Sequence, residues 1–357
     1  MSGNYEVEHS RHNIDQCKQW DKGPNSLQLV NQPHAASCSK RITLKRLNSS
    51  DKRRYMRSSS YSSPLLHTIT EYLSITKPAI ASLNVFVGLA TLLLAVSLNL
   101  ETALPLILLC VAGFLAAGGA GALNCYVERS LDSGMRRTQH RPLPSHRISD
   151  NVAISIGVGF SICGVALAAL FLNVLTAFLI GSGVFWYVLV YTLWLKPRTK
   201  WNIVIGGAAG CFSALAGWAA VTGSISFVAF LVAFLIFLWT PGHFWGLAIA
   251  RVDEYANVQI PMLPVVDGVK RSTIYTALSN IALFPFTLGL FALTANQGNI
   301  FVLIILAAVL VAFNLRFVIA NLRMIKSPGP MSAWRVFRMS ISYLFVVLLL
   351  TVAAHLI

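Results

Sequence analysis

The sequence has 357 residues, of which 55% are hydrophobic and only 11% are charged, and its mean hydropathy is +0.65. A soluble domain carries about 25% charged residues, so this composition excludes an ordinary soluble protein and predicts a polytopic membrane protein. The formal net charge of +15 would suggest nucleic-acid binding in a soluble chain. Here the positive charges follow the loops between apolar segments, so no nucleic-acid partner is expected and the lipid bilayer is the expected environment.

Residues 1–66 differ from the rest of the chain. They hold 11 Lys and Arg and five Asp and Glu, and they show no sustained apolar period. This composition predicts a disordered basic tail. The Arg- and Ser-rich stretch 36–63 is typical of a mitochondrial presequence, whereas four acids before residue 22 are not, so a presequence and a solvated extension both stay open.

Residues 67–357 are predicted to form one all-α membrane domain. Nine apolar segments follow one another, each near the roughly 20 residues needed to cross the hydrocarbon core as a helix. They span about 79–98, 103–125, 152–171, 174–195, 203–222, 226–250, 272–294, 299–320 and 338–356. We therefore expect nine transmembrane helices around a central cavity.

The charges of the connecting loops support this count. Nine spans place the connections alternately on two sides, and the four short connections on one side contain no Lys or Arg. All 17 Lys and Arg after residue 66 lie on the other side or within a few residues of it. The longer connections on that side are 126–151, 196–202, 251–271 and 321–337. The positive-inside rule predicts that this side, with the N-terminus, faces the cytoplasm, or the matrix in a mitochondrion.

Two carboxylate clusters end apolar helices on this basic side. Asn124, Glu128 and Asp132 are spaced by four residues, which places them on one helical stripe. The second cluster is Asp253 and Glu254, at the end of the sixth segment. Mg²⁺ prefers oxygen ligands and keeps substrate phosphates among them, so two such clusters are typical of a metal-bound diphosphate site. Solvated surface ion pairs remain the alternative.

Basic residues lie next to these carboxylates in the sequence. Arg136, Arg137 and Arg141 follow the first cluster, and Lys196, Arg198 and Lys200 follow the fourth apolar segment. The planar guanidinium group of arginine can bind two phosphate oxygens at once. These residues are therefore candidates to neutralise a diphosphate.

Four sequence blocks resemble a known family. The spacing of Asn124, Glu128 and Asp132 is similar to the first Asp-rich motif of the UbiA superfamily of intramembrane prenyltransferases. Its continuation D-S-G-M-R-R-T-Q-H-R-P-L-P, 132–144, resembles the protoheme IX farnesyltransferases, or haem O synthases. Three further blocks agree with that family. They are Y-L-S-I-T-K-P at 72–78, Y-T-L-W-L-K-P-R-T-K-W-N-I-V-I-G-G-A-A-G at 191–210, and W-T-P-G-H-F-W-G-L-A-I with D-E-Y-A-N-V-Q-I-P-M-L-P-V-V at 239–266.

The resemblance implies a UbiA-type bundle and a specific reaction. Farnesyl diphosphate would bind through Mg²⁺ at two sites, its C1–O bond would break, and the 2-vinyl group of haem B would attack the allylic cation. Water would then complete a hydroxyethylfarnesyl group, which gives haem O; haem B is a substrate here and no cofactor. A haem A synthase or the assembly of a terminal oxidase is the partner pathway that this implies.

The resemblance also implies roles for individual residues. The residues implied for metal and diphosphate are Asn124, Glu128, Asp132, Asp253 and Glu254. The residues implied to contact diphosphate are Arg137, Arg141, Lys196, Arg198 and Lys77. Tyr191 is a candidate to shield the cation, with an interfacial tyrosine as the alternative. His243 is a candidate to face haem, and a histidine hydrogen-bonded inside the bundle is the favoured alternative.

The chain departs from the family pattern at Ser130, where an acid is common, so a third acidic ligand in the first cluster is in doubt. Two rival functions stay open. One is another UbiA-type enzyme that prenylates a quinone precursor or a chlorophyll-like ring, and the other is a transporter or haem chaperone. The motifs favour a bacterial plasma membrane, with the mitochondrial inner membrane as the alternative.

Overall fold

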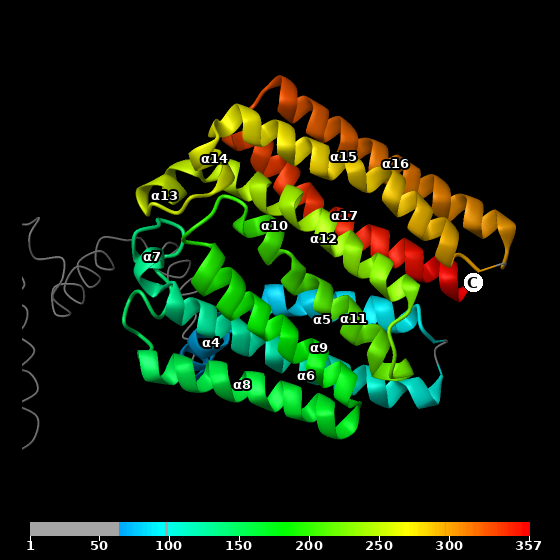
Figure 1. The fold of residues 1–357 in the computed structure, drawn as a ribbon, viewed down its shortest axis with the longest axis horizontal. Helices are drawn as coiled ribbons and strands as arrows, with labels where there is room; N and C mark the ends of the chain where they lie inside the picture. The colour runs from blue at the N-terminus through cyan, green and yellow to red at the C-terminus, as the bar shows by residue number, and fades with distance from the viewer. Residues whose placement is uncertain (1–63, 97–98, 297) are drawn as a thin grey trace, which may run out of the picture. The chain divides into compact units, whose positions relative to one another are not determined.

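The computed structural model describes residues 64–96, 99–296 and 298–357. Every regular element in these ranges is helical (Figure 1). The helices of the first half are α4 (Pro64–Ile75), α5 (Pro78–Leu93), α6 (Leu100–Val127), α7 (Arg129–Ser133), α8 (Asp150–Phe171), α9 (Val174–Phe185), the π-helix η1 (Trp186–Leu195), α10 (Asn202–Gly206) and α11 (Ala208–Thr222). Those of the second half are α12 (Phe227–Ala250), α13 (Val252–Asn257), α14 (Leu263–Val266), α15 (Gly268–Thr294), α16 (Ile300–Lys326) and α17 (Pro330–Leu356).

The predicted all-α membrane fold is confirmed. Eight helices in the described residues are long and apolar enough to cross a membrane, and the bent pair Thr68–Ile75 and Pro78–Leu93 makes a ninth when it is counted as one span. α9 continues into η1 as a single span, Val174–Leu195. Counted in this way, the spans of the described residues match the nine segments expected from the sequence. The predicted tail lies outside the described residues except for its last three, which begin α4.

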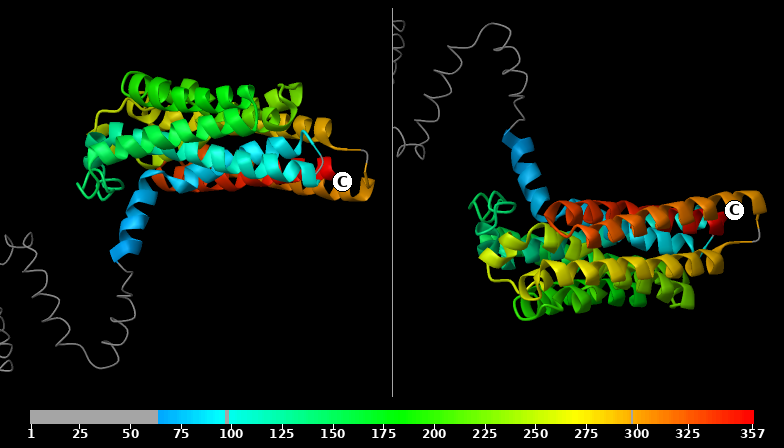
Figure 2. Two further views of the ribbon diagram at one scale, coloured as in Figure 1. Left: turned by 90° about the horizontal axis from the view of Figure 1, so that it is seen from below. Right: turned by 90° about the horizontal axis from the view of Figure 1, so that it is seen from above.

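The first span is bent because of Pro78. α5 has 16 residues, which is about 24 Å at 1.5 Å per residue and shorter than a hydrocarbon core of about 30 Å. α4 meets it at 53° (Figure 2). Lys77, the residue before Pro78, takes a left-handed backbone with φ 50° and ψ 59°, which is uncommon for a residue other than glycine. The bend thus places a lysine between two helices, at the end of the bundle.

The spans form two groups of neighbours (Figure 1). In the first group, α5 contacts α6, α6 contacts α8, α8 contacts α9, and α9 contacts α11, which returns to α5. In the second group, α12 contacts α15 and α17, and both of these contact α16; contacts of α11 with α12 and of α5 with α17 join the groups. The short helices α7, α13 and α14 all lie at one end of the bundle, opposite the C-terminus (Figure 1). Both predicted carboxylate clusters are therefore at the same end.

Glycines allow the closest helix contacts. A Cβ added at Gly119 of α6 would lie 2.6 Å from the Gly157 carbonyl oxygen of α8. A Cβ at Gly164 would lie 2.6 Å from the Ala112 carbonyl oxygen and 2.7 Å from the Ala116 nitrogen. Real Cβ atoms are not found that close to backbone atoms, so α6 and α8 must separate if either glycine is replaced.

We expect Gly164→Ala to lower the stability of the purified protein by about 1–3 kcal/mol, because the added methyl group overpacks against the backbone of α6. The matched control is Gly159→Ala on the same helix, where nothing lies within 4 Å of the added atom. That variant should melt at or above the wild-type temperature, since alanine favours a helix over glycine. Thermal unfolding in detergent measures both, and equal melting temperatures would contradict the close contact.

Candidate active site

The first carboxylate cluster is buried at the end of α6. Asn124 is 1% exposed in the last turn of α6, Glu128 joins α6 to α7, and Asp132 lies in α7. The backbone nitrogen of Asp132 donates to the Glu128 carbonyl at 2.8 Å, so the helical repeat continues across the junction. Asn124 Nδ2 donates to Glu128 Oε1 at 2.9 Å. The spacing of four residues therefore brings these side chains to one place, as predicted.

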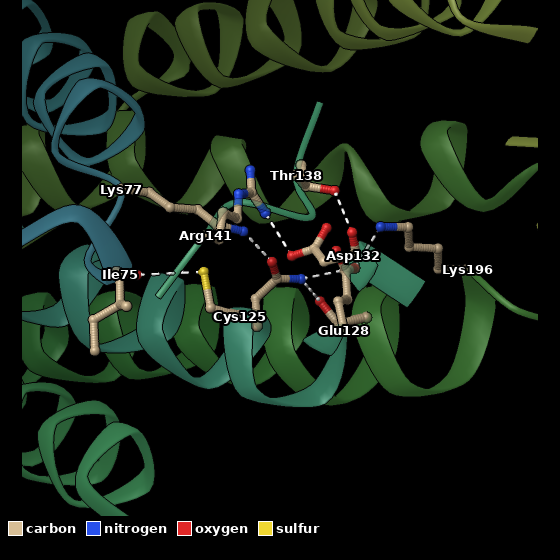
Figure 3. A network of polar contacts seen from close by, with 10 residues as sticks. Ile75, Lys77, Cys125, Glu128, Asp132, Thr138, Arg141 and Lys196 are labelled. Carbon is tan, nitrogen blue, oxygen red and sulfur yellow. Dashed lines mark hydrogen bonds and ion pairs between the residues drawn. The ribbon is translucent and has the colours of Figure 1, made fainter. Parts of the chain in front are cut away.

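Two lysines from other helices meet this cluster. Lys77, at the bend before α5, donates to Asn124 Oδ1, and Lys196, which follows η1, donates to Glu128 Oε1 (Figure 3). The side chains of Lys196 and Glu128 are only 12% and 9% exposed, so this is a nearly buried ion pair. Three separate segments of the sequence thus contribute to one charged network.

The loop after α7 closes over the same cluster. Arg141 Nη1 donates to Asp132 Oδ2 at 2.8 Å, and Thr138 Oγ1 donates to the Asp132 carbonyl oxygen at 3.1 Å (Figure 3). This contact uses one of the five guanidinium N–H groups of Arg141, so the others can donate to a further anion. The contact of the Arg141 guanidinium with the Asp132 carboxylate makes this loop a wall of the cluster.

Opposite charges keep this network ionised. Burial by itself would raise the pKa of Glu128, but the ammonium groups of Lys196 and Lys77 and the hydrogen bonds from Lys196 and Asn124 hold it below its ordinary value. Burial would lower the pKa of Lys196, and the Glu128 carboxylate raises it well above its ordinary value instead. At neutral pH the pair is therefore a carboxylate and an ammonium ion.

The fourth span reaches the cluster as a π-helix. Tyr191 is buried in η1, stacks on Tyr187 with ring centroids 5.8 Å apart, and accepts the backbone hydrogen bond of Lys196 at 2.9 Å. A Cβ at Gly206 would lie 2.3 Å from Tyr191 Cδ2, so this glycine makes room for the ring. The π-helix was not predicted from the sequence, because apolar periodicity over 174–195 does not distinguish it from an α-helix. It is identified by backbone hydrogen bonds that span five residues, such as the one from Lys196 to Tyr191.

The second carboxylate cluster borders a cleft at the same end of the bundle. Asp253 is exposed, and Glu254 Oε1 lies 3.4 Å from Arg251 Nη1. The cleft has a volume of about 540 Å³. Its lining residues are Gly134, Arg136, Arg137, Ala250, Arg251, Asp253, Glu254 and Asn257. The structure therefore brings the second cluster next to the loop that leaves the first one.

Two of the predicted site residues make other contacts. Arg198 Nη1 donates to the carbonyl oxygens of Leu193 and Trp194, both at 3.0 Å, so its guanidinium caps the C-terminal end of the fourth span. His243 lies between α12 and α17, where its Nδ1 is 2.7 Å from Ser340 Oγ. Its ring stacks between those of Trp239 and Phe337. His243 is thus hydrogen-bonded inside the bundle, which was the favoured alternative in the sequence-based prediction.

The sequence profile of the UbiA prenyltransferase family matches residues 83–349. The chain belongs to this family. It is 37% identical to protoheme IX farnesyltransferase 1 of Cenarchaeum symbiosum, over 78% of this chain and 93% of the relative. It is 41% identical to a protoheme IX farnesyltransferase of Rhizorhabdus wittichii, over 79% and 93%, and 38% identical to one of Sulfurisphaera tokodaii, over 82% and 95%.

Solved structures share the fold of this UbiA-family chain. A digeranylgeranylglyceryl phosphate synthase superposes with a TM-score of 0.61 at 17% identity, over 81% of this chain and 99% of that one. A UbiA homologue from Archaeoglobus fulgidus, solved with dimethylallyl diphosphate (DMAPP) and Mg²⁺, superposes with a TM-score of 0.58 at 14% identity, over 79% and 99%. The UbiA-type architecture expected from the motifs is therefore confirmed.

The carboxylates of this UbiA-family chain suit Mg²⁺ that is shared with a substrate. Among the described residues, no three His, Cys, Asp or Glu side chains are grouped closely enough to hold a metal by themselves. Glu128 and Asp132 each use one carboxylate oxygen in the network, and within the described ranges no hydrogen bond reaches the other. Mg²⁺ is commonly bound by one or two carboxylates with substrate phosphates and water, which is the donor set these oxygens provide.

We expect Lys196→Met to destabilise the protein by about 3–5 kcal/mol near neutral pH, because it leaves the buried Glu128 carboxylate without its adjacent cation. In the wild type the Glu128 pKa lies below its unfolded value of about 4.3, so its contribution is fully present above that pH and is lost only in stronger acid. In the variant, the charge and hydrogen bond of Lys196 no longer oppose burial, so we expect the Glu128 pKa to rise and the variant to lose stability as pH rises through it.

Melting temperatures between pH 5 and pH 8 measure this reversal. Lys196→Met should melt closer to the wild type at pH 5 than at pH 8. Arg198→Met is the control and should show the wild-type profile, because it removes a cation two residues away whose guanidinium, among the described residues, donates to the backbone carbonyls of Leu193 and Trp194 and to no carboxylate. The same pH profile for Lys196→Met and the wild type would contradict the buried ion pair.

Proposed function

We propose that this chain is a protoheme IX farnesyltransferase, which converts haem B into haem O with farnesyl diphosphate as the donor. The observation that carries the proposal is the similarity to relatives of that name, at 37–41% identity over about four fifths of this chain and more than nine tenths of each relative. The sequence blocks at the two carboxylate clusters agree with it. The balanced reaction is haem B, farnesyl diphosphate and water to haem O and diphosphate.

The charged network is suited to hold the diphosphate. Lys77, Lys196 and Arg141 each contact a different oxygen of the first cluster, so an anion that binds there would lie beside three cations. Arg136 and Arg137 line the neighbouring cleft without a hydrogen bond to any described residue, so their guanidinium groups are available to the same anion. Charge-assisted hydrogen bonds of this kind are about twice as strong as neutral ones.

The carboxylates would hold Mg²⁺ between the protein and the diphosphate. The first cluster offers the second oxygens of Glu128 and Asp132, and the cleft offers Asp253 and Glu254. When bound, Mg²⁺ stabilises the negative charge that develops on the leaving diphosphate. The basic residues of the network stabilise the same charge from the protein side.

The apolar parts of the site protect the allylic cation that remains. Tyr191 is buried beside Lys196, and its ring face can stabilise a cation. The vinyl group of haem B then forms a carbon–carbon bond to C1 of the farnesyl chain, and water adds to the resulting benzylic-type cation and loses a proton. Burial of Tyr191 and of Thr192 beside it keeps water away from C1 before the acceptor arrives.

The orientation follows from the basic loops. We place the end of the bundle that carries α7, α13 and α14 on the cytoplasmic side of a bacterial plasma membrane, or on the matrix side of a mitochondrion, because the Lys and Arg gather there. An Arg136→Cys variant that carries no other cysteine tests this in sealed vesicles. A reagent that cannot cross the membrane should label the cysteine only from the cytoplasmic or matrix side. A haem A synthase, or another enzyme that consumes haem O for a terminal oxidase, is the partner pathway that this function implies.

We expect membranes that contain the protein to form haem O when haem B, farnesyl diphosphate and Mg²⁺ are supplied. Mass spectrometry should show a haem whose mass has increased by one farnesyl group and one hydroxyl group. Membranes without the protein are the control. Prenylation of a quinone precursor or a chlorophyll-like ring in place of haem would contradict the proposed acceptor, and no prenyl transfer to any acceptor would contradict a prenyltransferase.

We expect Glu128→Gln and Asp253→Asn each to lower kcat/KM by at least about 100-fold, since each removes a charged metal ligand near the leaving diphosphate. Both changes keep the size of the side chain. Asp267→Asn is the control. Lys200 Nζ donates to both carboxylate oxygens of Asp267, at 2.7 Å and 2.9 Å, and Asp267 does not line the cleft. Full activity in both variants would rule out the carboxylates as the metal site.

A further inference from the structure

Thr192 of the π-helix η1 is buried against the first carboxylate cluster and has no assigned role. Its hydroxyl makes two hydrogen bonds with defined direction. Thr192 Oγ1 lies 2.8 Å from the Tyr187 carbonyl oxygen, which can only accept, so the single hydroxyl hydrogen is donated there. In its second contact, at 2.9 Å from Asn124 Nδ2, Thr192 Oγ1 must therefore be the acceptor.

The π-helix creates this arrangement. In an ordinary α-helix, a threonine hydroxyl that bonds back to the helix donates to the carbonyl four residues earlier. In η1 the donor and acceptor are five residues apart, so Thr192 donates to Tyr187. The hydroxyl oxygen is then left to face α6 as a pure acceptor.

The amide of Asn124 is thereby held in one orientation. Its two Nδ2 hydrogens are donated to Glu128 Oε1 and Thr192 Oγ1, both at 2.9 Å, and its Oδ1 accepts from Lys77. A flipped amide would direct its oxygen toward the Glu128 carboxylate and its NH₂ group toward the Lys77 ammonium ion. Both contacts would be repulsive, and Thr192 would lose its donor.

We propose that Thr192 is a positioning residue that acts through Asn124 to hold Lys77 and Glu128 in place for the diphosphate of the donor substrate. Thr192 does not touch the diphosphate itself. It supplies the acceptor for the second Nδ2 hydrogen of Asn124. Asn124 then holds the Lys77 ammonium ion through its Oδ1 and the Glu128 carboxylate through its Nδ2. This proposal rests on the diphosphate-binding part of the proposed function and not on haem as the acceptor.

A purely structural role of Thr192 would have a different effect on substrate binding. If Thr192 only ties η1 to α6, its loss lowers stability and affects substrate binding no more than it affects folding. If it acts through Asn124, its effect on diphosphate binding must vanish once the asparagine side chain is gone. A double-mutant cycle between Thr192 and Asn124 separates the two roles.

The experiment measures Mg²⁺-dependent binding of farnesyl diphosphate to the purified full-length protein, with no haem present. Thr192→Val keeps the shape of the side chain but removes the acceptor, and Thr192→Ser keeps the acceptor. We expect Thr192→Val to weaken binding about tenfold, since a buried N–H group loses its partner, and Thr192→Ser to stay within about twofold of the wild type. Melting temperatures of all variants are recorded alongside.

The cycle is completed by Asn124→Ala and by the double variant Asn124→Ala/Thr192→Val. We expect the valine to change binding by less than about twofold in the Asn124→Ala background. Equal binding by Thr192→Val and the wild type, or additive effects of the two changes, would overturn the proposal. If Thr192→Val does not fold, Thr192→Ala takes its place and is judged against Thr192→Ser in the same way. Because haem is absent, a wrong acceptor would fail the haem O assay while leaving this result unchanged.

Discussion

A carboxylate buried at the end of an apolar helix needs a cation beside it, and the ion pair between Glu128 and Lys196 meets this need. Removing two charges from water costs several kcal/mol per ion, which only close contact and further hydrogen bonds recover. Asn124 supplies one of these hydrogen bonds, and Lys77 approaches from the other side of the asparagine. The pair therefore requires α5, α6 and η1 to meet at one point, and the arrangement of the first half of the bundle follows from that.

Two irregular segments make this meeting possible. The bend before Pro78 puts Lys77 in a left-handed conformation that costs a non-glycine residue free energy, so its position is held by the surrounding contacts. At the end of the π-helix η1, Thr192 contacts Asn124 of α6, and Lys196, which follows η1, contacts Glu128 at the end of α6. Irregular backbone inside a membrane bundle is tolerated where protein groups satisfy it, and here those groups are the polar side chains of the site.

The two halves of the site differ in character. The first cluster is buried and already neutralised by cations of the chain, whereas Asp253 is exposed and lines an open cleft beside Arg136 and Arg137. A diphosphate with its metal ions would replace some of the internal ion pairs of the first cluster and add charge to the second. Exchange of one set of ionic contacts for another costs less than creating a buried charge, which suits a site that must bind and release a polyanion.

The sequence by itself determined the membrane class, the nine spans, the side on which the charges gather and the residues of both carboxylate clusters. These follow from local patterns, because lipid demands long apolar helices and because a spacing of four residues defines a helical stripe. Only the tertiary structure decided which cations meet which carboxylates. The sequence motifs assigned Lys196 and Arg198 to the diphosphate alike, whereas in the structure Lys196 pairs with Glu128 and Arg198 donates to the carbonyl oxygens at the end of its own helix. The direction of a side chain at a helix end depends on the π-helix and on the packing of neighbouring spans, and neither leaves a mark in apolar periodicity.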